Sequence, residues 1–387
     1  MRCILLVGFL FSFNNNLFAQ VFDGFQTINH NQIDRRFYLY VPNNYSVNLP
    51  TPKVFNFHGG GGDPISYMNY TSDMRGLAEA NNFILIYPEA IADPSTGSIS
   101  SWIDKATNGA PRDETLFIDA IINSINSNYS VDLDRIYACG YSEGGVFSYE
   151  LACRLNNKIA GIASVSGSML SESERSNLGF SNCSPQHPTA IMLIPGTSDT
   201  NPHSLYQGCC LDWGLDSYYL SVNQITDYWT NYNSTETNPS VSDVSNTNTT
   251  DGSTVQRKIW SNGQGGVEVQ ELKIIGGGHE WPGTSGNMDV NANNEIWQFL
   301  SRFDKNGMID TLNIEDLQMP ISVIPNPFND YFIIEGVEND LIELYDLHGR
   351  KVQSRLNNNF FNTESLKRGV YILILKEKDI SFKLVKS

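Results

Sequence analysis

Hydrophobic residues in the first three quarters of the chain gather in short blocks, and blocks typical of strands alternate with blocks typical of helices. Strands are predicted where apolar residues run together or alternate with polar ones, and helices where they recur about every 3.6 residues. The predicted strands are residues 36–41, 53–57, 83–87, 135–139, 159–165, 189–194 and 267–275, and the predicted helices are residues 113–125, 144–155, 222–229 and 294–303. This repeated order of strand and helix predicts a mostly parallel α/β sheet with helices on both faces.

Two segments of this region lead to separate structural predictions. Residues 235–251 are rich in Asn, Ser and Thr, a composition that predicts a mobile loop. Residues 267–275 alternate between apolar and polar side chains, which predicts a strand with one exposed face.

The last part of the chain has another pattern. Its apolar runs, residues 331–334, 341–345 and 370–375, are short and separated by turns, without a helical period between them. This favours a small all-β sandwich. Residues 319–387 contain nine acidic and nine basic side chains, so the negative excess of the chain lies before them. We therefore predict one domain over residues 20–306, a linker over residues 307–318 and a second domain over residues 319–387.

The N-terminus is typical of a secretory signal peptide over residues 1–19. Arg2 precedes an apolar run at residues 4–13, and Phe18-Ala19-Gln20 has the small residue of a cleavage site. The run is too short to cross a bilayer, although a buried first strand or an anchor is the alternative. We expect an extracellular protein, secreted or at the cell surface, without a membrane span.

The composition excludes some partners. The chain has 387 residues, 25 Lys and Arg against 42 Asp and Glu, and a formal net charge of −17. Nucleic acid and anionic membranes attract a positive face, so neither is expected as a partner. The hydrophobic fraction of 40% excludes a disordered chain.

Five cysteines remain after the signal peptide is removed, so at least one has no partner within the chain. Cys139 ends an apolar strand and is expected to be buried and free. Cys153 with Cys183 is the first choice for a disulfide in an exported protein. Cys209 and Cys210 are adjacent, and their pairing, with each other or elsewhere, stays open. Without a C-x-x-C pair, metal binding by these cysteines is not expected.

The sharpest chemical signal is Gly140-Tyr141-Ser142-Glu143-Gly144. It fits G-x-S-x-G and lies between a predicted strand and a predicted helix, the context in which this motif exposes a nucleophilic serine. The alternative is an ordinary glycine-rich turn. Ser142 is therefore the candidate nucleophile.

A serine hydroxyl needs a base, and the base needs an orienting acid. His279 follows a predicted strand in a glycine-rich loop and is the candidate base, with His203 as a weaker rival. Asp199 closely follows the strand at residues 189–194 and is the candidate acid. Asp212 and Asp216 are its rivals.

The glycine-rich segment His58-Gly59-Gly60-Gly61-Gly62 also follows a strand. Such a loop supplies backbone N–H groups to an oxyanion, together with the residue after the nucleophile. Gly59 and Glu143 are the candidate oxyanion donors. The candidate substrate contacts are His58, Trp102 and Trp281, and the alternative for either tryptophan is a place in the core.

These motifs together resemble a known group of enzymes. Residues 30–305 are similar to secreted esterases that include polyhydroxybutyrate depolymerases and the feruloyl and acetylxylan esterases of carbohydrate esterase family one. The resemblance rests on the motifs above and on segments 101–102, 113–118, 131–137, 151–153 and 278–283. It implies an α/β-hydrolase fold and a triad of Ser142, Asp199 and His279. Glu143 departs from the pattern, because the family usually has a small or amide residue there.

The C-terminal module is similar to the sorting domain of proteins exported by the type IX secretion system. The similarity runs through residues 324–329, 344–352, 366–371 and 383–386, and implies the secretion machinery as a partner. A carbohydrate-binding β-sandwich is the alternative, but the module has no tryptophan for stacking on sugars.

The expected function is that of a secreted carboxylic ester hydrolase without metal or cofactor. Acyl or feruloyl esters of plant polysaccharide are the first substrate class, and polyhydroxybutyrate-type polyesters are the second. Peptidase activity is a weaker possibility, and a catalytically inactive binding protein at the cell surface is the alternative from another class.

Overall fold

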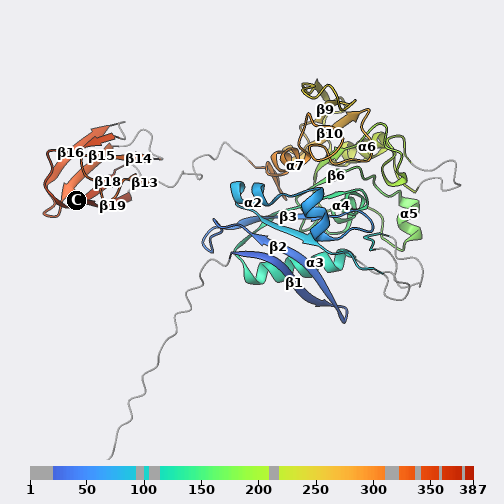
Figure 1. Cartoon of the computed structure of the whole chain (residues 1–387), viewed down its shortest axis with the longest axis horizontal. Coiled ribbons are helices and arrows are strands. Elements are labelled where there is room, and N and C mark those ends of the chain that lie inside the picture. Colours follow the sequence, from blue (N-terminus) through green and yellow to red (C-terminus); the bar gives the residue numbers. More distant parts are fainter. Residues whose placement is uncertain are drawn as a thin grey trace, which may run out of the picture. The chain divides into compact units, whose positions relative to one another are not determined.

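The computed structural model divides the chain into two compact units, residues 1–309 and residues 310–387 (Figure 1). It describes residues 21–92, 100–103, 114–208, 218–309, 322–335, 341–356, 360–376 and 380–387. The predicted signal peptide, Cys209, Cys210, Asp212 and Asp216 lie outside the described residues. Among the described residues, no helix is both long enough and apolar enough to cross a membrane.

The first unit is built on a ten-stranded sheet with the order β1-β2-β4-β3-β5-β6-β7-β10-β9-β8. Its centre is parallel, from β4 through β3, β5, β6 and β7 to β10, and antiparallel strands flank it on both sides. This is an α/β-hydrolase fold, so the predicted mostly parallel sheet is confirmed. The strands are β1 (Phe22–His30), β2 (Ile33–Val41), β3 (Thr51–Phe57), β4 (Ile84–Pro88), β5 (Val131–Tyr141), β6 (Gly161–Val165), β7 (Ala190–Ile194), β8 (Ser240–Asp243), β9 (Thr254–Trp260) and β10 (Val269–Ile275).

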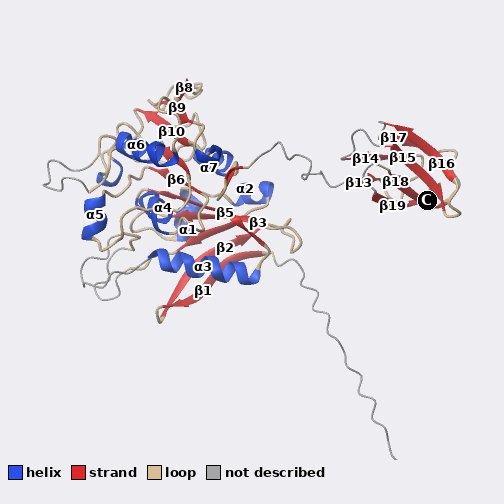
Figure 2. Ribbon diagram, turned by 180° about the vertical axis from the view of Figure 1, so that it is seen from behind, coloured by secondary structure: helices blue, strands red, loops and turns tan. Residues whose placement is uncertain are grey.

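Helices cover both faces of this sheet. One hydrophobic cluster joins the sheet to α3, α4 and α6, and a second joins its opposite face to α1, α2 and α7. Figure 2 shows α3 running beside β1 and β2. Because alternate side chains of each strand point to opposite faces, Phe55 belongs to the first cluster and Val54 to the second. The helices are α1 (Pro64–Tyr70), α2 (Arg75–Asn81), α3 (Glu114–Asn128), α4 (Glu143–Arg154), α5 (Glu172–Asn177), α6 (Val222–Asn233) and α7 (Ala292–Leu300).

Four details differ from the expectations. Strand β8 lies inside the segment expected to be a loop, and its four side chains are all exposed. Strand β10 is mostly buried rather than half exposed, because it lies between β7 and β9. The last helix ends at Leu300, and Phe303 begins β11 (Phe303–Asp304). The expected linker starts too early, since Gly307 belongs to β12 (Gly307–Met308), which pairs with β11.

The second unit consists of two antiparallel sheets around one apolar core. A three-stranded sheet has the order β13-β14-β17 and a four-stranded sheet has the order β16-β15-β18-β19. Their shared core includes Phe332 and Phe361, whose stacked rings lie 4.9 Å apart. The strands are β13 (Ser322–Ile324), β14 (Tyr331–Glu335), β15 (Leu341–Asp346), β16 (Lys351–Leu356), β17 (Phe360–Asn362), β18 (Gly369–Leu375) and β19 (Ile380–Lys386). The small all-β domain is thereby confirmed.

The cysteine predictions that fall on described residues are confirmed. Cys153 and Cys183 form a disulfide. Cys139 is free and buried in β5, and its burial raises the pKa of the thiol. A protonated, inaccessible thiol is a poor nucleophile, so Cys139 serves as a core residue.

Lys53 on β3 gives a testable link between pH and stability. Its side chain is buried, and its Nζ donates a hydrogen bond to Asn126 Oδ1 at 2.7 Å. Burial lowers the pKa of Lys53 to about 7. Between that value and the ordinary lysine pKa, the unfolded chain holds a proton that the folded chain has released. The free energy of unfolding therefore rises with pH in this window. The full cost of burying a charged Lys53 is present only below it.

We expect the free energy of unfolding of the wild type, measured relative to that of Lys53→Met, to increase by roughly 1 kcal/mol per pH unit between pH 7 and pH 10. Urea unfolding at several pH values measures this difference. Lys273→Met is the control, because Lys273 on β10 is only partly buried and lies over the ring of Tyr206. A difference independent of pH would contradict the prediction.

Candidate active site

The candidate residues meet where three strands end. Ser142 follows β5, Asp199 lies on the loop after β7, and His279 lies on the loop after β10. These strands are parallel members of one sheet, so their carboxyl ends share an edge. The two loops are also joined directly, because Thr197 N donates to Ile274 O at 2.9 Å and Ser198 N to Gly277 O at 2.8 Å.

Ser142 occupies a sharp turn between β5 and α4. Its φ of +55° and ψ of −122° lie outside the regions that a residue with a side chain prefers. The turn is held by hydrogen bonds from Ser142 N to Val165 O and from Gly145 N to Ser142 O, both 2.9 Å long. A Cβ on Gly144 would lie 2.3 Å from Phe57 O, so this position accepts only glycine. The strain and the close packing are typical of a nucleophile elbow.

A continuous line of hydrogen bonds runs from the serine to the acid. His279 Nε2 lies 2.9 Å from Ser142 Oγ, and His279 Nδ1 lies 2.8 Å from Asp199 Oδ2. Tyr141 supports the histidine, because its hydroxyl donates to His279 O at 2.9 Å and its ring lies 5.0 Å from the imidazole. With the proton on Nδ1, His279 is arranged to accept the hydroxyl proton of Ser142 at Nε2.

Asp199 is buried but well supplied with donors. Burial favours a higher pKa, but hydrogen bonds from His279, Ser204 and the backbone N–H of Asn201 outweigh it and lower the pKa of Asp199. The Ser204 hydroxyl donates to Asp199 Oδ2 at 2.6 Å and also lies 3.1 Å from His279 Nδ1. An ionised Asp199 can orient the imidazole and stabilise its cation.

Ser204 was not among the predicted site residues, and it supports a test of its own. Ser204→Ala removes one donor from Asp199 and leaves that carboxylate freer to rotate. We expect kcat to fall by about 3- to 10-fold with little change in KM. Steady-state kinetics on a soluble ester measures this, with Ser168→Ala on a neighbouring loop as control. An unchanged kcat would mean that Ser204 only fills space.

The glycine loop after β3 lies directly against the elbow. A Cβ on Gly59 would come within 3.3 Å of the Ser142 Cβ. Further along the loop, Gly62 N donates to Gly59 O at 3.1 Å and closes a tight turn. The backbone of Gly59 and that of Glu143, the first residue of α4, therefore flank Ser142, where an oxyanion would form.

The three residues expected to contact substrate are buried, and their contacts give them structural roles instead. His58 is 1% exposed; its Nδ1 donates to Gly59 O at 2.7 Å and its Nε2 accepts from Ala90 N at 3.2 Å. Burial lowers the pKa of His58, which suits a neutral ring that shapes the loop. Trp102 and Trp281 are each 1% exposed, so neither ring forms an open aromatic wall.

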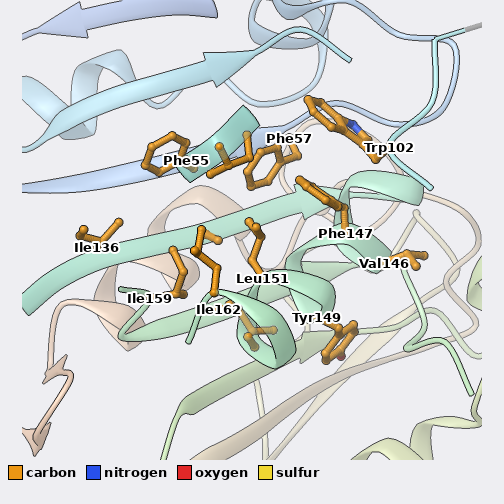
Figure 3. Packing of buried hydrophobic residues seen from close by; sticks show 14 of the residues in the cluster. Phe55, Phe57, Trp102, Ile136, Val146, Phe147, Tyr149, Leu151, Ile159 and Ile162 are labelled. Atoms are coloured by element: carbon orange, nitrogen blue, oxygen red, sulfur yellow. The ribbon is translucent and has the colours of Figure 1, made fainter. Parts of the chain in front are cut away.

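The two tryptophans are held from within the fold. Trp102 stacks on Phe147, a residue of α4, and meets Phe57 edge to face (Figure 3). The indole N–H of Trp281 donates to Asn293 Oδ1 at 3.1 Å. Both therefore support the site from the core, as the alternative for these residues anticipated.

Of the weaker candidates, His203 packs against Tyr219 with ring centres 5.1 Å apart. Its neighbour Ser204 contacts the candidate acid, Asp199. Among the described residues, no three His, Cys, Asp or Glu side chains gather closely enough to hold a metal ion.

Comparison with known proteins confirms the resemblances in both parts of the chain. Residues 322–386 match the family model of the Secretion system C-terminal sorting domain, which indicates a secreted protein. The chain is 26% identical over 276 residues to a bifunctional acetylxylan esterase/xylanase of Neocallimastix patriciarum, covering 71% of this chain and 34% of that protein. It is 30% identical over 178 residues to a probable feruloyl esterase C of Aspergillus flavus, covering 44% and 57%.

A third relative is the poly(3-hydroxyalkanoate) depolymerase C of Paucimonas lemoignei, 23% identical over 253 residues and covering 63% of this chain and 58% of that protein. The chain thus spans between about a third and three fifths of the length of these relatives. Among solved structures, the acetyl xylan esterase from Aspergillus awamori is similar over 72% of this chain and 99% of that one, with 18% identity and a TM-score of 0.47.

Proposed function

We propose that this chain is a secreted serine esterase that hydrolyses acyl or feruloyl esters of plant polysaccharides. The observation that carries the proposal is the hydrogen-bond line from Ser142 Oγ through His279 to Asp199. The sequence similarity to acetylxylan and feruloyl esterases supports the substrate class. The proposal assigns residues 20–309 to the esterase domain and residues 319–387 to a domain that meets the secretion machinery.

The proposed reaction has two stages. His279 Nε2 takes the proton from Ser142 Oγ as the oxygen attacks the ester carbonyl carbon. The tetrahedral intermediate collapses, the carbon–oxygen bond to the alcohol breaks, and His279 returns the proton to the leaving alcohol. Water then attacks the acyl-enzyme with the same base, which releases the acid and restores Ser142. Asp199 stabilises the imidazolium that forms in each stage.

The negative charge on the former carbonyl oxygen requires donors that are already in place. Backbone N–H groups of Gly59 and Glu143 are the proposed pair. The start of α4 adds the partial positive charge of a helix N-terminus beside the same oxygen. No metal or cofactor takes part in this proposal.

A polyester of the polyhydroxybutyrate type is the second candidate substrate. It is favoured by the similarity to a poly(3-hydroxyalkanoate) depolymerase, which covers 63% of this chain. The chemistry at Ser142 would be the same, since both substrates present a carboxylic ester.

A substrate panel tests the proposal. It consists of p-nitrophenyl acetate, methyl ferulate, acetylated xylan and short polyhydroxybutyrate, each with the wild type and with Ser142→Ala. Release that depends on Ser142 from methyl ferulate or acetylated xylan would support the first substrate class, and release from the polyester alone the second. No turnover of any ester would favour a binding protein that has kept the fold.

A further inference from the structure

The side chain of Glu143 has a role that the proposed reaction does not yet use. Glu143 directly follows Ser142 and is the first residue of α4, so its backbone N–H is one proposed oxyanion donor. Its carboxylate is buried, with the residue 4% exposed. A buried carboxylate is costly unless hydrogen-bond donors surround it.

The donors come from the short segment of residues 100–103. The Ser101 hydroxyl donates to Glu143 Oε1. Backbone N–H groups add two longer contacts, from Trp102 to Oε2 at 3.3 Å and from Ile103 to Oε1 at 3.4 Å. The carboxylate thus attaches this segment to the elbow.

The same segment is attached on its other side to the glycine loop. Gly61 N donates to Ser100 O at 2.7 Å, and Ser100 Oγ donates to Gly62 O at 2.8 Å. The indole N–H of Trp102 donates to His58 O at 2.7 Å. Three hydrogen bonds therefore connect segment 100–103 to the loop that carries Gly59.

Glu143 also meets the glycine loop directly. A Cβ on Gly60 would lie 3.0 Å from Glu143 Oε2, so the loop backbone passes close to the carboxylate. The indole of Trp102 lies against Phe57 and Phe147 in the core (Figure 3), and this packing holds the segment in place.

We propose that Glu143 is a positioning residue whose carboxylate holds the two halves of the oxyanion hole together. One half is the backbone N–H of Glu143 on the elbow, and the other is Gly59 on the glycine loop. The side chain sets their separation through segment 100–103. This inference rests on the proposed function, because it assigns a role within that reaction.

Glu143→Ala removes the acceptor of all three donors and leaves the backbone N–H of residue 143. We expect kcat on p-nitrophenyl acetate to fall by about 10²-fold with KM within about threefold of the wild type. Glu143→Gln keeps one acceptor oxygen, for Ser101 and Ile103, and is expected to recover most of kcat. Binding of phenylboronic acid, which forms a tetrahedral adduct with the serine, should weaken in parallel with kcat/KM.

Glu150→Gln is the matched control. Glu150 is a buried carboxylate of the same helix that pairs with Arg175, at a distance from the elbow along α4. Its substitution is expected to lower the Tm while kcat stays within about twofold of the wild type. A loss of kcat in this control equal to that of Glu143→Ala would assign both losses to damage of the helix and overturn the inference.

Ser101→Ala decides the matter if the Glu143 variants fail to fold. It deletes one donor to the carboxylate, and we expect a fall in kcat of about 3- to 10-fold with KM unchanged. A kcat within twofold of the wild type would overturn the inference. So would undiminished kcat in Glu143→Ala, provided that turnover still depends on Ser142. Turnover that survives Ser142→Ala would instead overturn the proposed function itself.

Discussion

Ser142→Ala is expected to lower kcat by about 10⁴- to 10⁶-fold on every ester that the wild type hydrolyses. The substitution deletes the oxygen that is proposed to attack the carbonyl, and His279 Nε2, 2.9 Å from it, loses its proposed proton donor. The fold should survive, because the turn is held by backbone hydrogen bonds of Ser142 and by glycine packing. The positive φ of residue 142 remains strained for alanine as it is for serine. Steady-state rates, with Tm and circular dichroism, measure both expectations.

The matched control for this prediction is Ser148→Ala. Ser148 is a buried serine of α4 whose hydroxyl donates to Gly144 O at 2.9 Å, so it tests loss of a hydroxyl without loss of the nucleophile. Its kcat is expected to stay within about threefold of the wild type. A fluorophosphonate probe should label the wild type and Ser148→Ala but leave Ser142→Ala unlabelled. Rates within tenfold of the wild type in Ser142→Ala would refute the serine mechanism.

The centre of the sheet was predictable because its strands are buried on both sides. Such strands leave continuous apolar runs in the sequence, as at residues 83–87. Strand β1 escaped prediction because its large apolar residues, Phe22, Phe25 and Ile28, are spaced by three rather than two. Strand β8 escaped because an exposed edge strand carries no apolar pattern at all.

The part of the candidate site that lies in short sequence motifs could be predicted. Ser142 lies in a five-residue motif, and His279 and Asp199 follow strands whose order places them at the same edge. The direction of a side chain could not be predicted from these motifs, because it depends on packing between segments far apart in the chain. The burial of Trp102, the contact of Ser204 with Asp199 and the donors around Glu143 all arise in this way. A serine in a polar loop carries no sign that it will face a buried carboxylate.

The arrangement around Asp199 leads to the second large effect, for Asp199→Asn. Asp199 Oδ1 accepts from Asn201 N at 2.8 Å, and Oδ2 accepts from both Ser204 and His279. In the variant, Asn201 N–H requires the amide oxygen on its side, so the amide NH₂ faces His279 Nδ1. The imidazole must then accept at Nδ1 and carry its proton on Nε2, where it can no longer take the proton of Ser142. A fall in kcat of about 10⁴-fold is expected, by analogy with the same substitution in the chymotrypsin triad.

Two further variants test whether Asp199 acts at the site and through Ser142. Asp132→Asn removes a carboxylate that pairs with Arg135 at the start of β5, at the opposite end of the strand from Ser142, and should leave kcat within about twofold of the wild type. The double variant Ser142→Ala with Asp199→Asn should be no slower than Ser142→Ala alone, because residues that act as one unit lose their function once. Additive losses would mean that Asp199 assists turnover by a route independent of the serine. In that case the hydrogen-bond line through His279 would not be the path by which the proton leaves Ser142.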